Sequence, residues 1–305
     1  MAEKNFYHNP VLLQECIEGL NIIPSGVYAD VTFGGGGHSR EILKHLGSKG
    51  KLFVFDQDLD AMENVPKDNR VFFFRTNFKY YAQFLRLAGY EKIDGVIADL
   101  GVSSHHFDDA RRGFSFRYDV PLDMRMNLDS DFSAVDLING YDTFRLTKIF
   151  SEYGEIKNAS RLALAIENYR KNKKIISVGD FMEAIKAYIP KFGENKFLAT
   201  VFQAIRIEVN DEIEVLKSFL TASKSVLKKN GRLVVISYHS LEDRPVKNFL
   251  KSGNFEGKQE KDVYGNIIAP FSLVNRKVIT PDDKEMENNS RSRSAKLRIA
   301  ERTVY

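Results

Sequence analysis

The stretch DVTFGGGGHS, residues 30–39, decides the fold of this chain. It continues a short run with strand character, Val27–Val31, and precedes a stretch long enough for a helix. A strand that enters a glycine-rich turn and then a helix is typical of a βαβ unit. Such a turn lets backbone N–H groups approach a ligand closely. The stretch therefore predicts a ligand-binding turn in an α/β domain.

Further runs of the same strand character follow along the chain. They are Leu52–Phe55, Val71–Phe74, Ile93–Ala98 and, much later, Arg232–Ile236. Because stretches long enough for helices separate the first four runs, the pattern favours βαβ units and a parallel sheet. Residues 296–304 alternate enough to form a last strand, and residues 11–20 have helical spacing ahead of the first one.

A long interval separates the fourth strand from the fifth, and most of it reads as an insertion. Two segments inside it, Ala159–Lys171 and Val178–Tyr188, have helical patterns. Apolar residues from Phe202 to Leu227 recur at three-to-four spacing, which predicts one long helix. We therefore expect a discontinuous sheet domain of residues 1–106 and 198–305. Residues 107–197 are expected to form an inserted, mostly helical domain that recognises the substrate.

The composition is that of a globular protein with little net charge. The 305 residues are 43% hydrophobic and 28% charged, which excludes wholesale disorder. A net charge of +4 is too small to establish a nucleic-acid partner. However, residues 289–302 carry five basic side chains and one acidic one, and residues 158–174 are also basic. Each segment is a candidate surface for RNA phosphates, with a solvated face as the alternative.

The cysteine count and the apolar runs indicate a cytoplasmic protein. Cys16 is the one cysteine, so no intramolecular disulfide can form. The first ten residues lack the apolar core of a signal peptide, and no apolar run approaches the roughly 18 residues of a membrane span. No coiled-coil seam appears, which leaves a monomer or a homodimer.

The residues around the glycine turn indicate the class of ligand. Asp56 follows the second strand, where an acid can accept both hydroxyls of a ribose. The dinucleotide pattern G-x-G-x-x-G is incomplete, because Ser39 stands at its third glycine. Asp30 would repel a pyrophosphate but can receive the ammonium group of a methionine moiety. These residues favour S-adenosylmethionine over a nicotinamide cofactor, with a plain tight turn and a surface acid as the alternative.

Two further strand ends point to the same crevice, since parallel sheets bind ligands at the carboxyl ends of their strands. Phe78 follows the third strand and is placed to stack on adenine or to pack in the core. Asp99 follows the fourth strand, where a transferred methyl group would meet its acceptor.

These residues lie within blocks of sequence that resemble a known family, the MraW-type methyltransferases of small-subunit ribosomal RNA. The matching blocks, in chain order, are HNPVLLQE (8–15), DVTFGGGGHS (30–39), DQDLDA (56–61), DGVIADLGVSS (94–104), RGFSF (112–116), PLDMRM (121–126), FQAIRIEVNDE (202–212), ISYHSLEDR (236–244) and NSRSRSAKLRIAER (289–302). The blocks span nearly the whole chain, and PLDMRM and HSLEDR are the most specific. The resemblance implies a class I methyltransferase sheet with an inserted helical domain. It also implies methylation of a cytidine N4 amine in the decoding centre, the P-site region of 16S rRNA, within the small ribosomal subunit.

The resemblance also implies a set of cofactor contacts. Carried over by position, they are Gly36, Gly37, His38, Asp56, Phe78 and Asp99. His106 stands where the family has a glutamine; it can donate or accept one hydrogen bond, whereas an amide does both at once. Tyr238 stands where the family has a phenylalanine.

Two side chains are candidates for catalysis. The cytosine amine is a poor nucleophile because its lone pair is delocalised into the ring, so an acceptor for an amine proton would help. Asp99, or the carbonyl of Leu100, is our candidate for this acceptor, with a role toward the cofactor alone as the alternative. His239 is a candidate for holding the base edge or shuttling a proton; a helix cap and a structural ion pair in the HSLEDR block are the alternative.

Several arginines are candidate RNA contacts. They are Arg112, Arg125, Arg206, Arg244, Arg291 and Arg293. Arg112 lies next to two phenylalanines that stack on bases or pack in the core. Arg125 can instead pair with Asp123, and Arg206 shares a polar stripe with Gln203 and Asn210 that can orient the PLDMRM or HSLEDR loop.

We expect no metal site. His105, His106, Asp108 and Asp109 are adjacent, and neighbours of this kind rarely form a closed site, so a solvated loop is favoured. The competing functions are a methyltransferase for another RNA or a small molecule, a nicotinamide-dependent dehydrogenase, and a non-enzymatic RNA-binding assembly factor.

Overall fold

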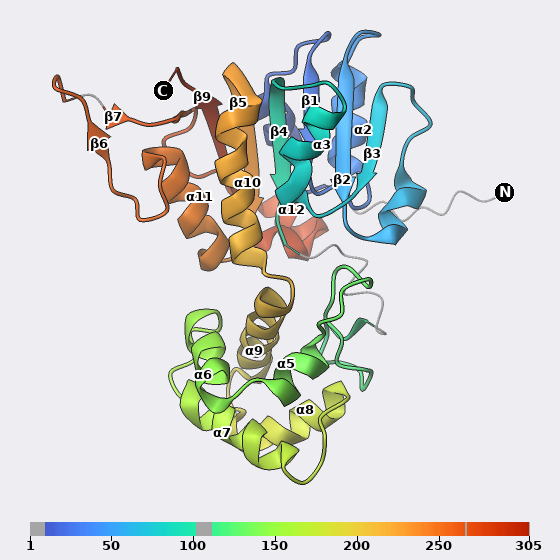
Figure 1. The fold of residues 1–305 in the computed structure, drawn as a ribbon, viewed down its shortest axis with the longest axis vertical. Helices are drawn as coiled ribbons and strands as arrows, with labels where there is room; N and C mark the ends of the chain where they lie inside the picture. Colours follow the sequence, from blue (N-terminus) through green and yellow to red (C-terminus); the bar gives the residue numbers. More distant parts are fainter. Residues whose placement is uncertain (1–9, 102–111, 266, 305) are drawn as a thin grey trace. The chain divides into compact units, whose positions relative to one another are not determined.

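The computed structural model describes residues 10–101, 112–265 and 267–304 and divides into two compact units (Figure 1). The first unit joins Met1–Gly101 with Ile213–Tyr305, and the second is Val102–Glu212. The fold is thus a discontinuous sheet unit interrupted by a helical one.

The first unit is built on a sheet in which seven strands of the described residues follow the order β3-β2-β1-β4-β5-β9-β8. The strands are β1 (Val27–Asp30), β2 (Lys51–Asp56), β3 (Val71–Arg75), β4 (Ile93–Asp99), β5 (Leu227–Ser237), β8 (Phe271–Leu273) and β9 (Lys296–Arg302). The first five are parallel to their neighbours, whereas β9 runs antiparallel to β5 and β8. The predicted α/β class is confirmed.

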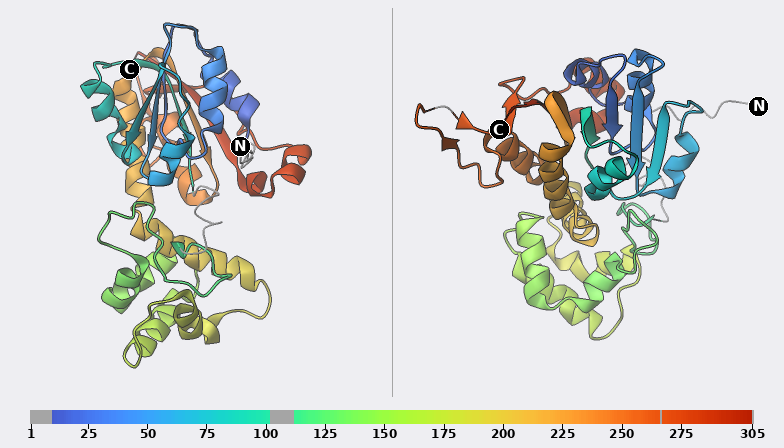
Figure 2. Two further views of the ribbon diagram at one scale, coloured as in Figure 1. Left: turned by 90° about the vertical axis from the view of Figure 1, so that its right-hand side faces the viewer. Right: turned by 45° about the horizontal axis from the view of Figure 1, so that its top comes forward.

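Helices cover both faces of this sheet (Figure 2). Successive side chains of a strand point to opposite faces, so Phe53 and Phe55 of β2 join one core and Leu52 and Val54 the other. The first core includes residues of α3 (Tyr81–Leu87), α10 (Glu212–Val226) and α11 (Ser240–Ser252), and the second includes residues of α1 (Leu13–Leu20) and α2 (Gly37–His45). The shorter elements are η1 (Leu59–Asn64), η2 (Phe78–Tyr80), β6 (Glu260–Lys261), β7 (Ile267–Ile268), α12 (Asp283–Asn288) and η5 (Ser290–Ser294).

The second unit has its own apolar core between helices. They are α5 (Ala134–Gly140), α6 (Thr143–Glu152), α7 (Ala159–Arg170), α8 (Val178–Ile185), η4 (Lys186–Tyr188) and α9 (Glu194–Val209). Capping boxes at Ser133 and Ser177 begin α5 and α8, because each serine accepts from the backbone N–H three residues on and an aspartate returns the bond. The two helices predicted within the insertion are therefore present.

The single long helix expected up to Leu227 is instead two helices, α9 and α10. Asn210 caps the first, and Asp211 adopts a left-handed φ of 52°, which interrupts the helix. The apolar periodicity continues across this break, which is why spacing alone predicts one helix. The apolar face of α9 lies in the core of the second unit, so that unit ends after Glu212 rather than after residue 197.

Among the described residues, no helix combines the length and the apolar character that crossing a membrane requires.

Candidate functional site

The glycine turn joins β1 to α2 in a conformation that its own packing imposes. Gly34 and Gly36 have positive φ angles of 49° and 73°. A Cβ added to Gly36 would lie 2.8 Å from the ring of Phe33, and one added to Gly37 would lie 2.3 Å from Cγ of Pro10. Gly36 and Gly37 are therefore needed by the fold itself, before any ligand is considered.

Asp30 lies beneath the turn and is bonded to it. Its carboxyl accepts from the Ser39 hydroxyl at 2.6 Å and from the Thr32 N–H at 3.2 Å. The side chain is buried, and desolvation raises the pKa of Asp30. This carboxyl therefore braces the turn from below.

Asp56 lies at the end of β2 and binds the turn from the other side. Its Oδ2 accepts from the Gly34 N–H at 2.8 Å and its Oδ1 from the Asp58 N–H at 2.9 Å. Each carboxylate oxygen has a second lone pair, so this half-buried group can also accept the two hydroxyls of a ribose. A Cβ added to Gly35 would meet no described atom within 4 Å, so the turn is open to a ligand at this point.

Asp99, the last residue of β4, lies beside groups from three other segments. The Tyr238 hydroxyl donates to its Oδ1 at 2.7 Å, and its backbone N–H donates to Thr32 Oγ1 at 2.6 Å. Oδ2 is 3.9 Å from Nδ1 of His38, beyond hydrogen-bonding distance. Desolvation raises the pKa of Asp99 to about 6, so the carboxyl is ionised at neutral pH.

His38 is nearly buried in the first turn of α2. Its Nε2 lies 3.0 Å from the carbonyl of Val11, and a carbonyl only accepts, so this nitrogen carries a proton. The ring is thereby fixed with Nδ1 toward Asp99.

Phe78 begins η2 after β3, as the sequence predicts, and its side chain packs against the first apolar core. Its ring meets that of Phe219 edge-on, with centroids 5.6 Å apart. The side chain is only partly buried, so a ring face is left to stack on an aromatic ligand.

Carboxylates thus follow β1, β2 and β4 at the same edge of the sheet, and the glycine turn lies among them. This distribution disfavours a pyrophosphate, as the sequence predicts. It fits a ligand that has a ribose and a positive charge, which S-adenosylmethionine has.

The HSLEDR block begins α11, and its acidic side chains bond to His239, to the Tyr238 backbone and to β9. His239 Nε2 lies 3.2 Å from Glu242 Oε1, and Glu242 Oε2 accepts from the Tyr238 N–H at 2.8 Å. Asp243 accepts two bonds from Arg298, at 2.6 and 3.1 Å. The alternative of a structural ion pair is therefore present here, whereas the N-cap position of α11, His239, makes no side-chain cap hydrogen bond. Arg244 is exposed.

Three of the candidate RNA-binding arginines have structural partners within the second unit. Arg112 is buried and donates to the carbonyls of Arg125 and Met126, at 2.9 and 3.1 Å. Arg125 pairs with Asp123 at 2.7 Å, and Arg206 forms two bonds to Glu212, at 2.7 and 2.9 Å. These contacts brace the 112–126 segment and the end of α9.

Asn210, at the end of the polar stripe of α9, binds the backbone of the PLDMRM segment. Its side-chain carbonyl accepts from the Met126 N–H at 2.7 Å, and its amide donates to the Met124 carbonyl at 2.8 Å. Met124 has a left-handed φ of 59°, so these bonds hold a strained backbone. Gln203, on the same stripe, reaches only the Tyr153 carbonyl at 3.4 Å.

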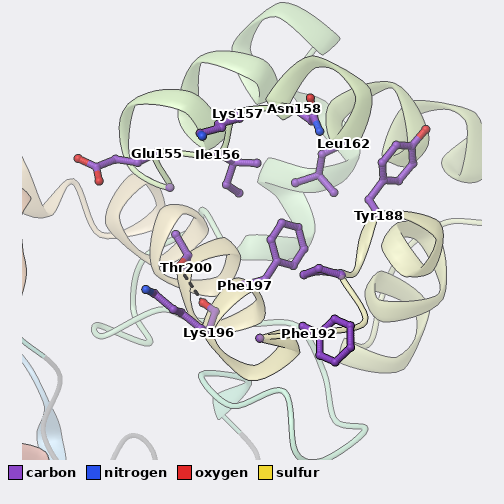
Figure 3. A pocket seen from close by; sticks show the side chains of 13 residues that line it. Glu155, Ile156, Lys157, Asn158, Leu162, Tyr188, Phe192, Lys196, Phe197 and Thr200 are labelled. Carbon is purple, nitrogen blue, oxygen red and sulfur yellow. Dashed lines mark hydrogen bonds between the residues drawn. The ribbon is translucent and has the colours of Figure 1, made fainter.

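The second unit also contains a cavity of about 460 Å³, lined by residues before and within α7 and by η4 and α9 (Figure 3). Tyr188, Phe192 and Phe197 line it together with Lys157 and Lys196. No candidate site residue named above contributes to its described lining.

The basic tail is largely occupied by contacts within the first unit. Arg298 and Lys296 pair with Asp243, and Arg302 donates to the carbonyls of Lys224 and Pro270. Arg291 and Arg293, in η5, remain exposed. Because these two are the exposed members of the tail's five basic residues, they remain its candidate phosphate contacts.

The basic segment at 158–174 also has internal partners. Lys171 pairs with Glu167, Lys173 with Asp180, and Arg170 donates to the Ile138 carbonyl. The four histidine and aspartate residues at 105–109, with the predicted cofactor contact His106, lie outside the described residues.

Two features escaped the sequence analysis, the Tyr238–Asp99 hydrogen bond and the Thr32 hydroxyl that receives the Asp99 N–H. Thr32 directly follows one predicted strand and Tyr238 lies two residues after another, which is the one signal available. The adjacency of β4 and β5 brings Tyr238 to Asp99.

Comparison with known proteins gives consistent results. Residues 5–303 match the model of the MraW methylase family. The chain is 59% identical over 304 residues to the ribosomal RNA small subunit methyltransferase H of Parabacteroides distasonis, covering 99% of this chain and 100% of that one. It is 57% identical over 296 residues to the protein of the same name from Bacteroides thetaiotaomicron, covering 97% of each chain.

Proposed function

Because this chain belongs to the MraW methylase family, and so is an S-adenosylmethionine-dependent methyltransferase, we propose that it methylates the N4 amine of a cytidine in the decoding centre of 16S rRNA. The names of its relatives, which specify small-subunit ribosomal RNA, support the substrate class. The choice of the cytidine N4 amine follows from the family resemblance described above, and Asp99 offers an acceptor that suits an amine.

The open oxygen of Asp99 carries this proposal. Oδ1 accepts from Tyr238, while no described residue donates to Oδ2. With a pKa of about 6, the carboxyl is an ionised acceptor at neutral pH. An acceptor of this kind draws an amine proton and restores the lone pair to nitrogen as the N–CH₃ bond forms. The proton then passes to Asp99 and on to solvent, which frees the methylated amine.

The cofactor residues complete the site. Asp56 would accept the ribose hydroxyls, Phe78 would lie against the adenine, and the backbone near Gly35 would border the methionine moiety. When bound, the cofactor supplies a methyl group already activated on a sulfonium. The main task of the chain is then alignment, which contributes roughly 7–11 kcal/mol in favourable cases.

Recognition of the RNA is proposed to involve the second unit and the exposed arginines of the first. Arg244, Arg291 and Arg293 are exposed and suit phosphate contacts, whereas Arg112, Arg125 and Arg206 support the second unit from within. A cytidine in a folded subunit must leave its stack, at a cost of a few kcal/mol, to enter the site. We place this reaction in the cytoplasm, where small subunits are assembled.

The decisive experiment uses S-adenosylmethionine with a labelled methyl group and small ribosomal subunits from cells that lack this enzyme. We expect one labelled nucleotide, a cytidine methylated at N4 in the decoding centre, identified by nuclease digestion and mass spectrometry. Label on another base, or none on subunits and naked 16S rRNA alike, would remove the proposal.

The variant Asp99→Ala tests the catalytic assignment in the same assay. Cofactor binding is expected to be retained within a few-fold, while methyl transfer falls at least a hundredfold, the lower range for general-base catalysis. Unimpaired transfer would limit Asp99 to a role in binding.

A further inference from the structure

We propose that Tyr238 is a positioning residue for methyl transfer, because its hydroxyl occupies one oxygen of Asp99 and leaves the other to meet the substrate amine. The inference rests on the proposed function for the identity of that amine. The contact between Tyr238 and Asp99 does not depend on it.

Strand adjacency brings the two side chains together. β4 and β5 are parallel neighbours, with Asp99 paired to Ile236. Tyr238 lies two residues beyond that pair, and its hydroxyl donates to Asp99 Oδ1 at 2.7 Å. This is a short, charge-assisted hydrogen bond at the edge of the sheet where ligands bind.

Tyr238 is itself fixed at both ends. Its backbone N–H donates to the buried Glu242 carboxyl at 2.8 Å. Its ring lies against Gly101, where an added Cβ would be 3.2 Å from the ring. Gly101 has a φ of 105°, a conformation that other residues rarely adopt. The hydroxyl therefore has a defined position from which to orient a carboxylate.

Among the described residues, the remaining contacts of Asp99 leave Oδ2 without a hydrogen-bond donor. Thr32 accepts from its backbone N–H, which holds the main chain. His38 faces Oδ2, but its nearer nitrogen is 3.9 Å away and its other nitrogen donates to Val11. Without the Tyr238 bond, the carboxyl would be free to rotate and to present either oxygen.

The charge of Asp99 also depends on this contact. The titratable groups that face it are His38, Asp30, Glu242, Cys16 and Tyr238. Burial raises the pKa of Asp99, whereas His38 and the Tyr238 hydrogen bond lower it. Burial and the nearby Asp99 raise the pKa of Tyr238 well above its usual value, so the hydroxyl keeps its proton and remains a donor. Removing the hydroxyl must therefore move the pKa of Asp99 upward from about 6.

The variant Tyr238→Phe tests the inference, because it keeps the ring against Gly101 and removes only the donor. In steady-state methylation of small subunits we expect kcat to fall about tenfold, with the KM for S-adenosylmethionine changed less than about twofold. The acidic limb of kcat against pH is expected to move upward by about one pH unit. Tyr28→Phe is the matched control, since it removes a hydroxyl that accepts from the Ile23 N–H at 2.7 Å near the amino end of β1. It should leave the pH profile unchanged.

A double variant separates positioning from a general loss of structure. If Tyr238 acts through Asp99, adding Tyr238→Phe to Asp99→Asn should change kcat less than about twofold, because the group that it orients is already inactive. A full, independent tenfold loss in that background would overturn the inference.

A readout without substrate distinguishes this inference from the proposed function. The pH dependence of urea unfolding reports the pKa of Asp99 in the folded protein. Tyr238→Phe should move that titration upward even if no subunit is methylated, in which case only the proposed function fails. An unchanged unfolding profile, together with an unchanged rate profile, would overturn the role of Tyr238 even in an active cytidine methyltransferase.

Discussion

At the scale of single residues, the site holds a charge that the folded protein disfavours. Desolvation raises the pKa of Asp99 from 3.8 to about 6. A folded-state pKa above the unfolded value means that the ionised form destabilises the fold. This loss in the free energy of unfolding is absent below about pH 4, grows as the pH rises to 6 and is constant above that. A shift of about two units corresponds to roughly 3 kcal/mol.

This cost predicts that Asp99→Asn stabilises the protein in the absence of ligands. The amide cannot ionise, and its oxygen can still accept from Tyr238. At pH 8 we expect the free energy of unfolding to rise by about 2–3 kcal/mol, and this gain should shrink toward zero near pH 4. Urea unfolding between pH 4 and 8 measures it. A difference that stays the same at every pH would show that the charge of Asp99 is not its source.

The same residues show what the sequence can predict at this scale. Asp56 and Asp99 were predictable, because each follows a recognisable strand of a parallel sheet. The bonds of Asp30 to Ser39 and Thr32 were not predictable, because they depend on how the turn folds over that carboxyl. Tyr238 was not predictable, since its role depends on a pairing between strands that the whole insertion separates in the chain.

At the scale of elements, the glycine turn combines packing with ligand access. In Gly37→Ala the new Cβ would lie 2.3 Å from Pro10 Cγ, whereas in Gly35→Ala it would enter space free of described atoms. We expect Gly37→Ala to lower the free energy of unfolding by about 1–3 kcal/mol, as overpacking does. Gly35→Ala should change it by less than about 0.5 kcal/mol while weakening cofactor binding about tenfold or more. Chemical unfolding and calorimetric titration separate the two effects; equal loss of stability in both variants would contradict this division.

The helix α9 gives a second contrast between neighbouring polar residues. Asn210 bonds to both Met124 and Met126, whereas Gln203 makes one long contact with Tyr153. We expect Asn210→Ala to destabilise the second unit by about 1–3 kcal/mol, because two backbone groups lose their partners. Gln203→Ala should cost less than about 0.5 kcal/mol. Proteolysis within residues 112–126 reports the release of that segment, and equal susceptibility of both variants would refute the assignment. Helical periodicity predicts that Gln203 and Asn210 share one polar stripe. Only the folded structure shows that Asn210 is the residue that bonds to the 112–126 segment.

At the scale of the whole molecule, the basic residues of the tail divide into half-buried ones in β9, which include the partners of Asp243, and exposed ones in η5. The sequence predicts the parallel sheet and a helical insertion, because each depends on local patterns. It misplaces the end of the insertion, since the apolar face of α9 has the same periodicity whichever core it joins. It also overstates the basic tail, because Lys296 and Arg298 pair with an aspartate from a distant block.

The two exposed arginines of η5 therefore carry the last prediction, on RNA binding. β9 begins beside the end of β5, so Arg291 and Arg293 precede it at the same edge of the sheet as Asp99. A cation that contacts phosphate releases bound counterions, and each such contact contributes about 0.7–0.9 to the slope of log affinity against log salt. We expect Arg291→Gln with Arg293→Gln to weaken 16S rRNA binding and to reduce that slope by about one to two.

Lys49→Gln with Lys67→Gln removes the same charge from exposed residues just before β2 and β3, near the opposite edge, and should leave the slope unchanged. Filter binding at several salt concentrations measures both variants. Equal slopes in the two would mean that the arginines act only through net charge, and the phosphate contacts would then belong to the second unit.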